Sequence, residues 1–168
     1  MRVATWNMKQ AVAPRKPLQE LWTWAEEAIA PDVAVFTEAR VPTAGPPPGW
    51  SALWIDGGFG SRRRWGTVLA GRNLEVVPVG EVRTRFQRVQ LKPTWPAAVQ
   101  VADVMVSRER WATVIGLYGV TVDESGEKCG HGRHSIPQTL KDLRPLFKSD
   151  RRDRIVVAGD FNMWPKDR

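Results

Sequence analysis

The sequence has very few of the residues that form disulfides or soft metal sites. Its 168 residues include one cysteine and two histidines, namely Cys129, His131 and His134. One cysteine excludes an intrachain disulfide, which fits a reducing compartment and favours a cytoplasmic protein. A structural zinc site takes four nitrogen or sulfur ligands, and these three residues fall short of that set.

Long apolar runs are also lacking. No apolar stretch approaches the roughly 20 residues that a membrane-spanning helix needs, so no membrane span is expected. The first ten residues contain Asn7 and Lys9 and have no basic segment followed by an apolar core, so no secretory signal is expected. We find no internal repeat and no linker, and we expect residues 1–168 to form a single domain.

Charge is the main compositional feature. Lys and Arg total 25 against 18 Asp and Glu, which gives a net charge of +7. Such a field attracts polyanions and favours a phosphate-bearing substrate, with nucleic acid as one candidate. An arginine-rich coding genome explains the same balance equally well. The chain also has nine tryptophans, most of which we expect in the core.

The apolar pattern predicts a layered α/β protein with many strands and two helices. One amphipathic helix is expected over residues 17–30. A second is expected to begin at Ser135, which is a suitable N-cap, and to kink or end at Pro145. Strands are expected at residues 2–6, 33–37, 53–55, 67–70, 74–79, 98–106, 113–120 and 155–158.

Polar side chains directly follow three of these expected strands. They are Asn7, Glu38, and the pair Asp160 and Asn162. A strand end projects a side chain into a cleft at little entropic cost, and Mg²⁺ prefers such oxygen ligands. Taken singly, each residue is better explained as an ordinary turn residue, because Asp and Asn bond to nearby backbone. The set as a whole points to an oxygen-rich pocket.

Four motifs occur in the order used by the endonuclease/exonuclease/phosphatase superfamily, which the sequence therefore resembles. They are Ala4-Thr5-Trp6-Asn7, Phe36-Thr37-Glu38, Ile115-Gly116-Leu117-Tyr118 and Gly159-Asp160-Phe161-Asn162. The last motif, which follows an apolar strand, is the most specific. The resemblance implies a deoxyribonuclease-like four-layer αββα sandwich without its C-terminal strands.

The resemblance also implies a Mg²⁺-dependent phosphoester hydrolase, with Mn²⁺ as an alternative ion, and favours a nuclease or phosphodiesterase. Glu38 resembles the metal ligand of the family and Asn7 its neighbour. Asp160 resembles the residue that orients or deprotonates the attacking water, and Asn162 a donor to the phosphate and the transition state. Tyr118 resembles a phosphate-contacting tyrosine, although a core tyrosine with a satisfied hydroxyl is an equal alternative.

Two further features have weaker support. His134 stands where some members of the family carry a histidine that protonates the leaving group, and a solvent-exposed loop residue is the simpler reading. The run Arg62, Arg63, Arg64 and Trp65 matches a family loop that contacts substrate, so it is a candidate for gripping phosphates and stacking on a base or sugar. A solvated basic turn explains the run as well, and Arg83, Arg85 and Arg88 are candidates for extending the same surface.

The sequence departs from the family after Asn162. Family members carry a later Asp and a catalytic His, and here no histidine follows His134. A gene fragment, a segment supplied by another chain, or a natural short form that binds phosphates without catalysis would each explain this. We therefore expect little or no hydrolysis from the 168-residue chain alone and an exposed apolar strand near its end. The alternative function is a non-catalytic, basic nucleic-acid-binding module or a structural remnant of the fold.

Overall fold

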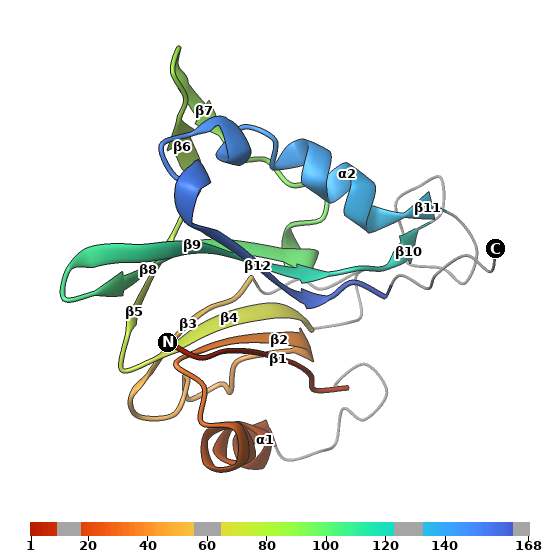
Figure 1. Cartoon of the computed structure of the whole chain (residues 1–168). Helices are drawn as coiled ribbons and strands as arrows, with labels where there is room; N and C mark the ends of the chain where they lie inside the picture. Colours follow the sequence, from red (N-terminus) through yellow and green to blue (C-terminus); the bar gives the residue numbers. More distant parts are fainter. Residues whose placement is uncertain (10–17, 56–64, 123–132, 163–168) are drawn as a thin grey trace.

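The structure, a computed structural model, describes residues 1–9, 18–55, 65–122 and 133–162. Two four-stranded sheets lie face to face, with α1 (Leu18–Trp24) outside one sheet and α2 (Ser135–Asp142) outside the other (Figure 1). This arrangement has the αββα layers that the sequence predicted. No helix within the described residues has the length and apolar character that crossing a membrane requires.

The first sheet contains the two strands that open the chain. β1 and β2 run parallel, whereas β2 pairs antiparallel with β4, which in turn pairs with β3. β3 begins at Trp50 rather than at the expected residue 53, because its register is set by pairing with β4 and by the burial of Trp50. The strands of this sheet, in spatial order, are β1 (Val3–Asn7), β2 (Val33–Ala39), β4 (Gly66–Arg72) and β3 (Trp50–Leu53).

The second sheet carries the C-terminal strand of the described chain at one edge. β12 runs parallel to β9, and the remaining pairs are antiparallel. The strands, in spatial order, are β12 (Ile155–Asp160), β9 (Glu109–Tyr118), β8 (Val99–Val106) and β5 (Glu75–Pro78). Val157 in the edge strand β12 is 40% exposed.

The continuous apolar run in β2 is explained by burial on both of its faces. Val33 and Val35 pack between the two sheets, whereas Ala34 and Phe36 pack toward α1. The sheets approach closely where Gly116 of β9 faces β2, because a Cβ atom there would lie 3.1 Å from a methyl of Val35 and 3.1 Å from a methyl of Thr67. A strand covered on both sides has no polar face, which is why the sequence shows no alternation there.

Both predicted helices are present, with corrected ends. The first is α1 (Leu18–Trp24), which continues as the π-helical turn η1 (Ala25–Ile29) and closes with a bond from the Ala30 amide to the Ala25 carbonyl. The second is α2 (Ser135–Asp142), and its N-cap is His134 rather than Ser135. The Ser135 hydroxyl instead accepts the Val120 amide, so it is used to join two segments.

The remaining elements are short. The hairpin of β6 and β7 was not predicted, because Val82 and Val89 are its only apolar strand residues and its sequence is otherwise polar. These elements are β6 (Glu81–Arg83), β7 (Arg88–Gln90), β10 (Thr121–Val122), β11 (Arg133–His134), η2 (Pro96–Ala98), η3 (Leu146–Lys148) and η4 (Arg152–Arg154).

An ion pair fixes the segment before β12 to the second sheet. The Arg151 guanidinium donates to both carboxylate oxygens of Asp103, at 2.9 Å for Nη2 to Oδ2, and Thr113 donates to Oδ1 of the same carboxylate. The side chains of Arg151 and Asp103 are only 18% and 11% exposed, respectively. This pair therefore places the start of β12, whose other end carries Asp160.

Candidate active site

Four strands from both sheets end at the same end of the sandwich. Asn7 ends β1 and Glu38 lies near the end of β2, while Tyr118 and Asp160 end β9 and β12. β1 and β2 are parallel, and so are β9 and β12, so the carboxyl ends of the two strands in each pair lie side by side. Residues from separate parts of the sequence thus meet at one edge, where polar groups can be presented to a ligand.

A hydrogen bond between the sheets joins Tyr118 to Glu38. The tyrosine hydroxyl donates to Oε1 of Glu38 at 2.6 Å, although the two residues are 80 positions apart. Tyr118 is 3% exposed, whereas Glu38 is half-buried. The carboxylate is therefore oriented by a group from the opposite sheet and still reaches solvent.

The environment of Tyr118 keeps its hydroxyl protonated. Burial raises the pKa of Tyr118 well above its ordinary value, and the hydrogen bond to Glu38 and the charges of Glu38 and Asp160 raise it further. A hydrogen bond with the Asn162 side chain acts in the opposite direction. Because both carboxylates act on the same phenol, Tyr118 lies within the field of Glu38 and Asp160 together, and it serves as a neutral donor near pH 7.

The backbone at Glu38 is irregular. Its φ of 46° lies in the left-handed region, and the pairing of β2 with β4 shifts register between Phe36 and Ala39. Strict alternation would place Glu38 on the α1 face with Ala34 and Phe36, yet its carboxylate meets Tyr118 of the other sheet. The irregularity re-aims the side chain, which is a known use of such bulges next to functional sites.

A second hydrogen bond between the sheets joins Asn7 to Asp160. The Asn7 amide Nδ2 donates to Oδ2 of Asp160 at 3.0 Å. Oδ1 of Asp160 accepts the backbone amide of Asn162 at 3.1 Å, so both carboxylate oxygens are held. Asn7 Oδ1 accepts the Lys9 amide, which orients the other end of the Asn7 side chain.

The turn after β12 is tied to α2 by His134. Asn162 has a φ of 49° and donates from Nδ2 to the Gly119 carbonyl at 2.9 Å. The His134 ring lies 3.2 Å from the Asn162 carbonyl through Nε2 and accepts the Ile136 amide through Nδ1. This pattern places the proton on Nε2. His134 is thus beside the site, and both of its ring nitrogens contact backbone groups.

The expectation for Trp65 does not fit its position. Trp65 is only 4% exposed and packs edge-on against Tyr118, with ring centroids 5.4 Å apart. A ring buried in this way packs against Tyr118 inside the protein and is not accessible for stacking on a base or sugar. Arg62, Arg63 and Arg64 lie outside the described residues. Sequence reasoning missed the contact of Trp65 with Tyr118, because no periodicity or motif connects residues so far apart in the chain.

The donor set suits a hard divalent cation. No group of three or more His, Cys, Asp or Glu gathers within the described residues. The two carboxylates of Glu38 and Asp160 and the amide oxygen of Asn7 are all hard oxygen donors with lone pairs beyond those used in the hydrogen bonds above. Mg²⁺ commonly takes only one or two carboxylates from a protein and keeps several waters, so this set fits it.

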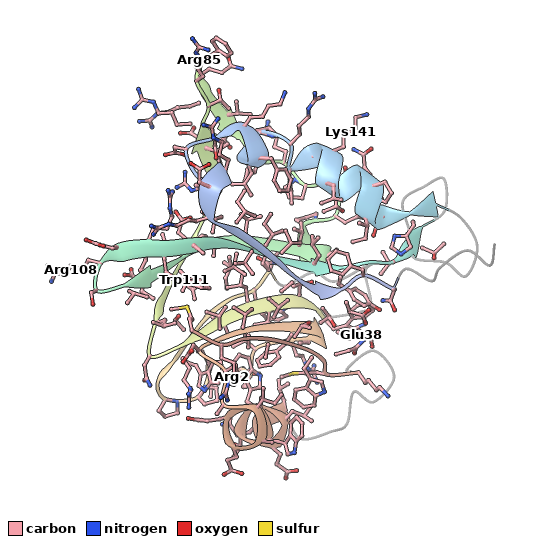
Figure 2. All side chains as sticks on the ribbon, in the orientation of Figure 1. Arg2, Glu38, Arg85, Arg108, Trp111 and Lys141 are labelled. Atoms are coloured by element: carbon pink, nitrogen blue, oxygen red, sulfur yellow. The ribbon has the colours of Figure 1, made fainter. Side chains whose placement is uncertain are left out.

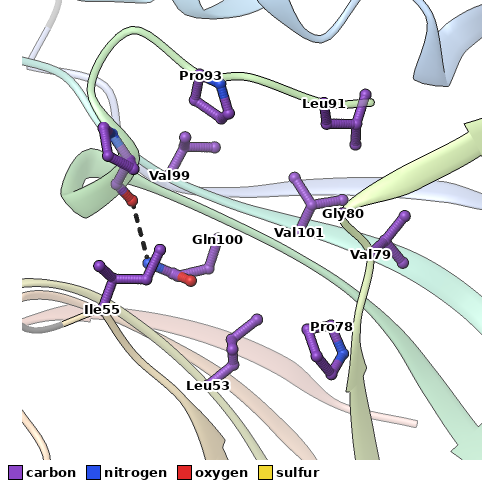
Figure 3. Close-up of a pocket in the computed structure, with 11 residues that line it drawn as sticks. Leu53, Ile55, Pro78, Val79, Gly80, Leu91, Pro93, Val99, Gln100 and Val101 are labelled. Carbon is purple, nitrogen blue, oxygen red and sulfur yellow. Dashed lines mark hydrogen bonds between the residues drawn. The ribbon is translucent and has the colours of Figure 1, made fainter. Parts of the chain in front are cut away.

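An apolar cavity of about 190 Å³ lies elsewhere, between the sheets at β3, β5 and β8 (Figure 3). Leu53, Val79, Leu91 and Val101 contribute to its lining, and the one amide there, Gln100, donates to the Pro96 carbonyl. None of the polar strand-end residues lines this cavity. The candidate site is therefore the polar end of the sandwich and not this cavity.

Comparisons with known proteins match this chain by structure alone. No protein-family model and no curated protein matches the sequence. The structure is similar to the endonuclease domain of TRAS1, a telomere-specific non-LTR retrotransposon, with a TM-score of 0.60 and 13% identity over 98% of this chain and 60% of that one. It is also similar to a humanized TDP2 from D. rerio, with a TM-score of 0.54 and 16% identity over 98% and 63% of the two chains.

A third similar structure is the 3′ phosphatase NExo from Neisseria bound to a product DNA hairpin, with a TM-score of 0.52 and 19% identity over 99% of this chain and 60% of that one. The chain thus spans about three fifths of the length of these structures. The fold is of the endonuclease/exonuclease/phosphatase type, and the predicted deoxyribonuclease-like α/β sandwich is confirmed.

Proposed function

We propose that the polar end of the sandwich is the site of a Mg²⁺-dependent phosphoester hydrolase, whose parent reaction is in-line attack of water on a phosphodiester. The observation that carries the proposal is the pair of hydrogen bonds between the sheets, from Tyr118 to Glu38 and from Asn7 to Asp160. They hold two carboxylates, an amide and a neutral phenol at one solvent-accessible place. Such a preorganised set is what charge stabilisation at a phosphoryl group needs.

Glu38, with Asn7 beside it, would hold the cation. A bound Mg²⁺, or Mn²⁺ in its place, neutralises negative charge on a phosphoryl group. Tyr118 would donate its hydroxyl to a phosphoryl oxygen, which requires that the hydroxyl release its hydrogen bond to Oε1 of Glu38. The raised pKa of Tyr118 keeps the proton on the phenol. The Asn162 Nδ2 amide, which donates to the Gly119 carbonyl and contacts the Tyr118 hydroxyl, is a further donor to the same charge once it releases one of these partners.

Asp160 is the residue we assign to the attacking water. Its two oxygens are held by Asn7 and by the Asn162 amide, so its orientation is fixed before a ligand arrives. A carboxylate held in this way can accept a proton from a water molecule and align it for attack. His134 remains a candidate for protonating the leaving group through Nε2, which requires that it release the Asn162 carbonyl.

We propose nucleic acid as the substrate class. The net charge of +7 favours a polyanion. Two of the similar structures are described as an endonuclease domain and as a 3′ phosphatase bound to DNA, and these descriptions support the same class.

The metal site is tested by titrating the 168-residue protein with Mn²⁺ and following free ion by electron paramagnetic resonance. Glu38→Gln is expected to weaken binding about tenfold or more, since it removes a ligand charge. Glu109→Gln is the matched control, because Glu109 is exposed at the opposite end of β9. Equal affinities of the Glu38→Gln and wild-type proteins would contradict the site.

The alternative is a basic module that binds nucleic acid without hydrolysis. It differs from the proposed function in how binding depends on salt and on Mg²⁺. Binding through phosphate contacts alone weakens steadily as salt rises and does not need Mg²⁺. The proposed site instead predicts that a phosphodiester ligand binds more tightly when Mg²⁺ is present, and that this gain is lost in Glu38→Gln. A gain that is absent in the wild-type protein would favour the alternative.

A further inference from the structure

The β6–β7 hairpin projects from the outer face of the second sheet, away from the site (Figure 1). Three contacts fix it to the rest of the chain. Val82 is 1% exposed and packs in the core beneath the hairpin. The Leu91 amide donates to the Gly80 carbonyl, and the Asp150 amide donates to the Arg83 carbonyl. The hairpin is therefore a rigid projection, although a two-stranded hairpin alone would be marginal.

The tip of this hairpin is ordered by the side chain of Thr84. Its hydroxyl donates to the Gln87 carbonyl at 2.9 Å and accepts the amides of Phe86 and Gln87. Phe86 at the tip is 88% exposed, more than any other large apolar side chain among the described residues. A rigid turn that presents an aromatic ring to water leaves that ring available to a partner.

Arginines surround this ring. The guanidinium of Arg85 lies 5.7 Å from the centroid of the Phe86 ring. Arg83 and Arg88 are direct cross-strand partners, and both are exposed. Like charges opposite each other in a hairpin destabilise it, and only Arg88 has an acidic partner nearby, Glu81 at 3.4 Å, among the ion pairs of the described residues. An anion placed between the two arginines would relieve this repulsion.

Figure 2 shows Arg85 at the tip of the hairpin and Glu38 at the other side of the molecule. The hairpin contacts the chain at Ser149 and Asp150, just before β12 begins, and Asp160 lies at the other end of β12. At about 3.3 Å per residue, the strand alone spans about 17 Å. The hairpin therefore cannot contact the same phosphate as the site, and it does not extend one surface with Glu38.

We infer that the hairpin tip binds single-stranded nucleic acid, with a base stacked on Phe86 and phosphates held by Arg83, Arg85 and Arg88. Stacking on an exposed aromatic ring together with arginine contacts to the backbone is how single strands are bound without sequence preference. The inference deepens the proposed function, on which it rests for the choice of a polynucleotide, by adding a second contact remote from the hydrolytic site. A single strand is favoured because an unpaired base can offer its face to the ring.

The experiment measures the affinity of a fluorescent single-stranded oligonucleotide of about 16 nucleotides, with a chelator present so that the metal site plays no part. Phe86→Ala is expected to weaken binding about 5- to 150-fold, the effect of losing one stacked base. Trp24→Ala is the aromatic control, because Trp24 is 49% exposed on α1 in the opposite outer layer. Thermal melting of each variant checks that it is folded.

A second set of variants separates the contribution of the arginine charge to binding from that of the Phe86 ring. Arg85→Ala is expected to reduce the salt dependence of binding by about 0.7 in logarithmic slope for the lost phosphate contact. Lys141→Ala, an exposed cation on α2, is the control and should leave the slope unchanged. The same measurements in a Glu38→Gln background should give the same losses, so failure of the hydrolase proposal and failure of this one remain distinguishable.

Three results would overturn the inference. One is an affinity of Phe86→Ala within twofold of the wild-type protein. Another is Phe86-dependent binding to anionic lipid vesicles with no effect on the oligonucleotide, which would assign the tip to a membrane surface. The third is a concentration-dependent dimer that Phe86→Ala dissociates while oligonucleotide binding is unaffected, which would assign the tip to a second copy of the chain.

Discussion

The Tyr118 hydroxyl and the Glu38 carboxylate meet at 2.6 Å across the two sheets of the sandwich. This contact connects the end of β9 with an irregular residue of β2 whose φ is 46°. Alternation in β9 points Tyr118 toward the first sheet, as it does Gly116, whereas Glu38 reaches Tyr118 only through the irregularity in β2. The contact therefore reports directly on the geometry of the whole site, and it can be followed by experiment.

Tyr118 is the only tyrosine of the chain, so its ionisation can be measured without assignment. Burial and the neighbouring carboxylates raise its pKa above the ordinary 10.0. We expect little tyrosinate absorbance in the folded protein at pH values around 10, where the unfolded protein ionises. An absorbance titration checks this, and a tyrosine that titrates at its ordinary value in the folded state would contradict the burial.

The same shift predicts how stability depends on pH. Because the folded pKa is higher than the unfolded one, the stabilisation by Tyr118 is complete below about pH 10 and is lost as the pH rises toward the folded pKa. Tyr118→Phe lacks this contribution, so its free energy of unfolding should fall less steeply than that of the wild-type protein above about pH 10. Urea unfolding on both sides of that pH gives the comparison.

The bond between Asn7 and Asp160 should appear as a coupling energy. Asn7→Ala and Asp160→Ala each remove one partner, and the double variant removes both. We expect a coupling of about 0.5–1.5 kcal/mol in urea unfolding, which is the usual range for one hydrogen bond between contacting residues. Additive effects of the two substitutions would mean that the bond does not persist in solution.

Gly159 is required by the backbone at the start of the Asp160 motif. Its φ is 144°, and a Cβ atom would lie 1.9 Å from the Leu117 carbonyl oxygen of β9. Gly159→Ala is expected to destabilise the fold by about 2 kcal/mol or more. Gly80→Ala is the control, since a Cβ atom there would meet nothing within 4 Å, and its effect should stay within about 0.5 kcal/mol.

The ion pair of Arg151 and Asp103 should contribute more to the free energy of unfolding than the exposed ion pairs do. Arg151→Met leaves the Asp103 carboxylate, 11% exposed, without its cation and is expected to cost about 3 kcal/mol. Arg152 and Asp153 form an exposed ion pair that serves as the control, with side chains that are 67% and 84% exposed. Arg152→Met should therefore cost less than about 1 kcal/mol. Chemical unfolding of both variants tests the difference, and equal costs would contradict the assigned role of burial.

The layers and most strands could be predicted from the sequence, because buried strands such as β2 carry unbroken apolar runs. The hairpin of β6 and β7 could not, because its stability comes from long-range contacts of Val82 and Arg83 rather than from a local apolar pattern. The N-cap of α2 was assigned to the wrong residue for a similar reason. Ser135 has the better intrinsic preference, but its hydroxyl is occupied by the Val120 amide.

The candidate site was predictable as a set of residues but not as a geometry. Strand ends and motif order selected Asn7, Glu38, Tyr118 and Asp160, which the structure brings together. The sequence does not show that Glu38 adopts a left-handed backbone, since glutamate has no preference for it. It also suggested an exposed role for Trp65, because composition cannot distinguish a tryptophan that faces solvent from one that packs behind Tyr118.

The close approach of the sheets at Gly116 has a consequence for how this molecule tolerates change. The distance between Tyr118 and Glu38 depends on how closely β9 and β2 pack through the side chains between them. Gly116 lies only two residues before Tyr118. A methyl group added there would press on Val35 and Thr67 and separate the two layers locally. Interior volume alone, with every polar residue intact, would then be enough to lengthen the contact between Tyr118 and Glu38 at the polar end of the sandwich.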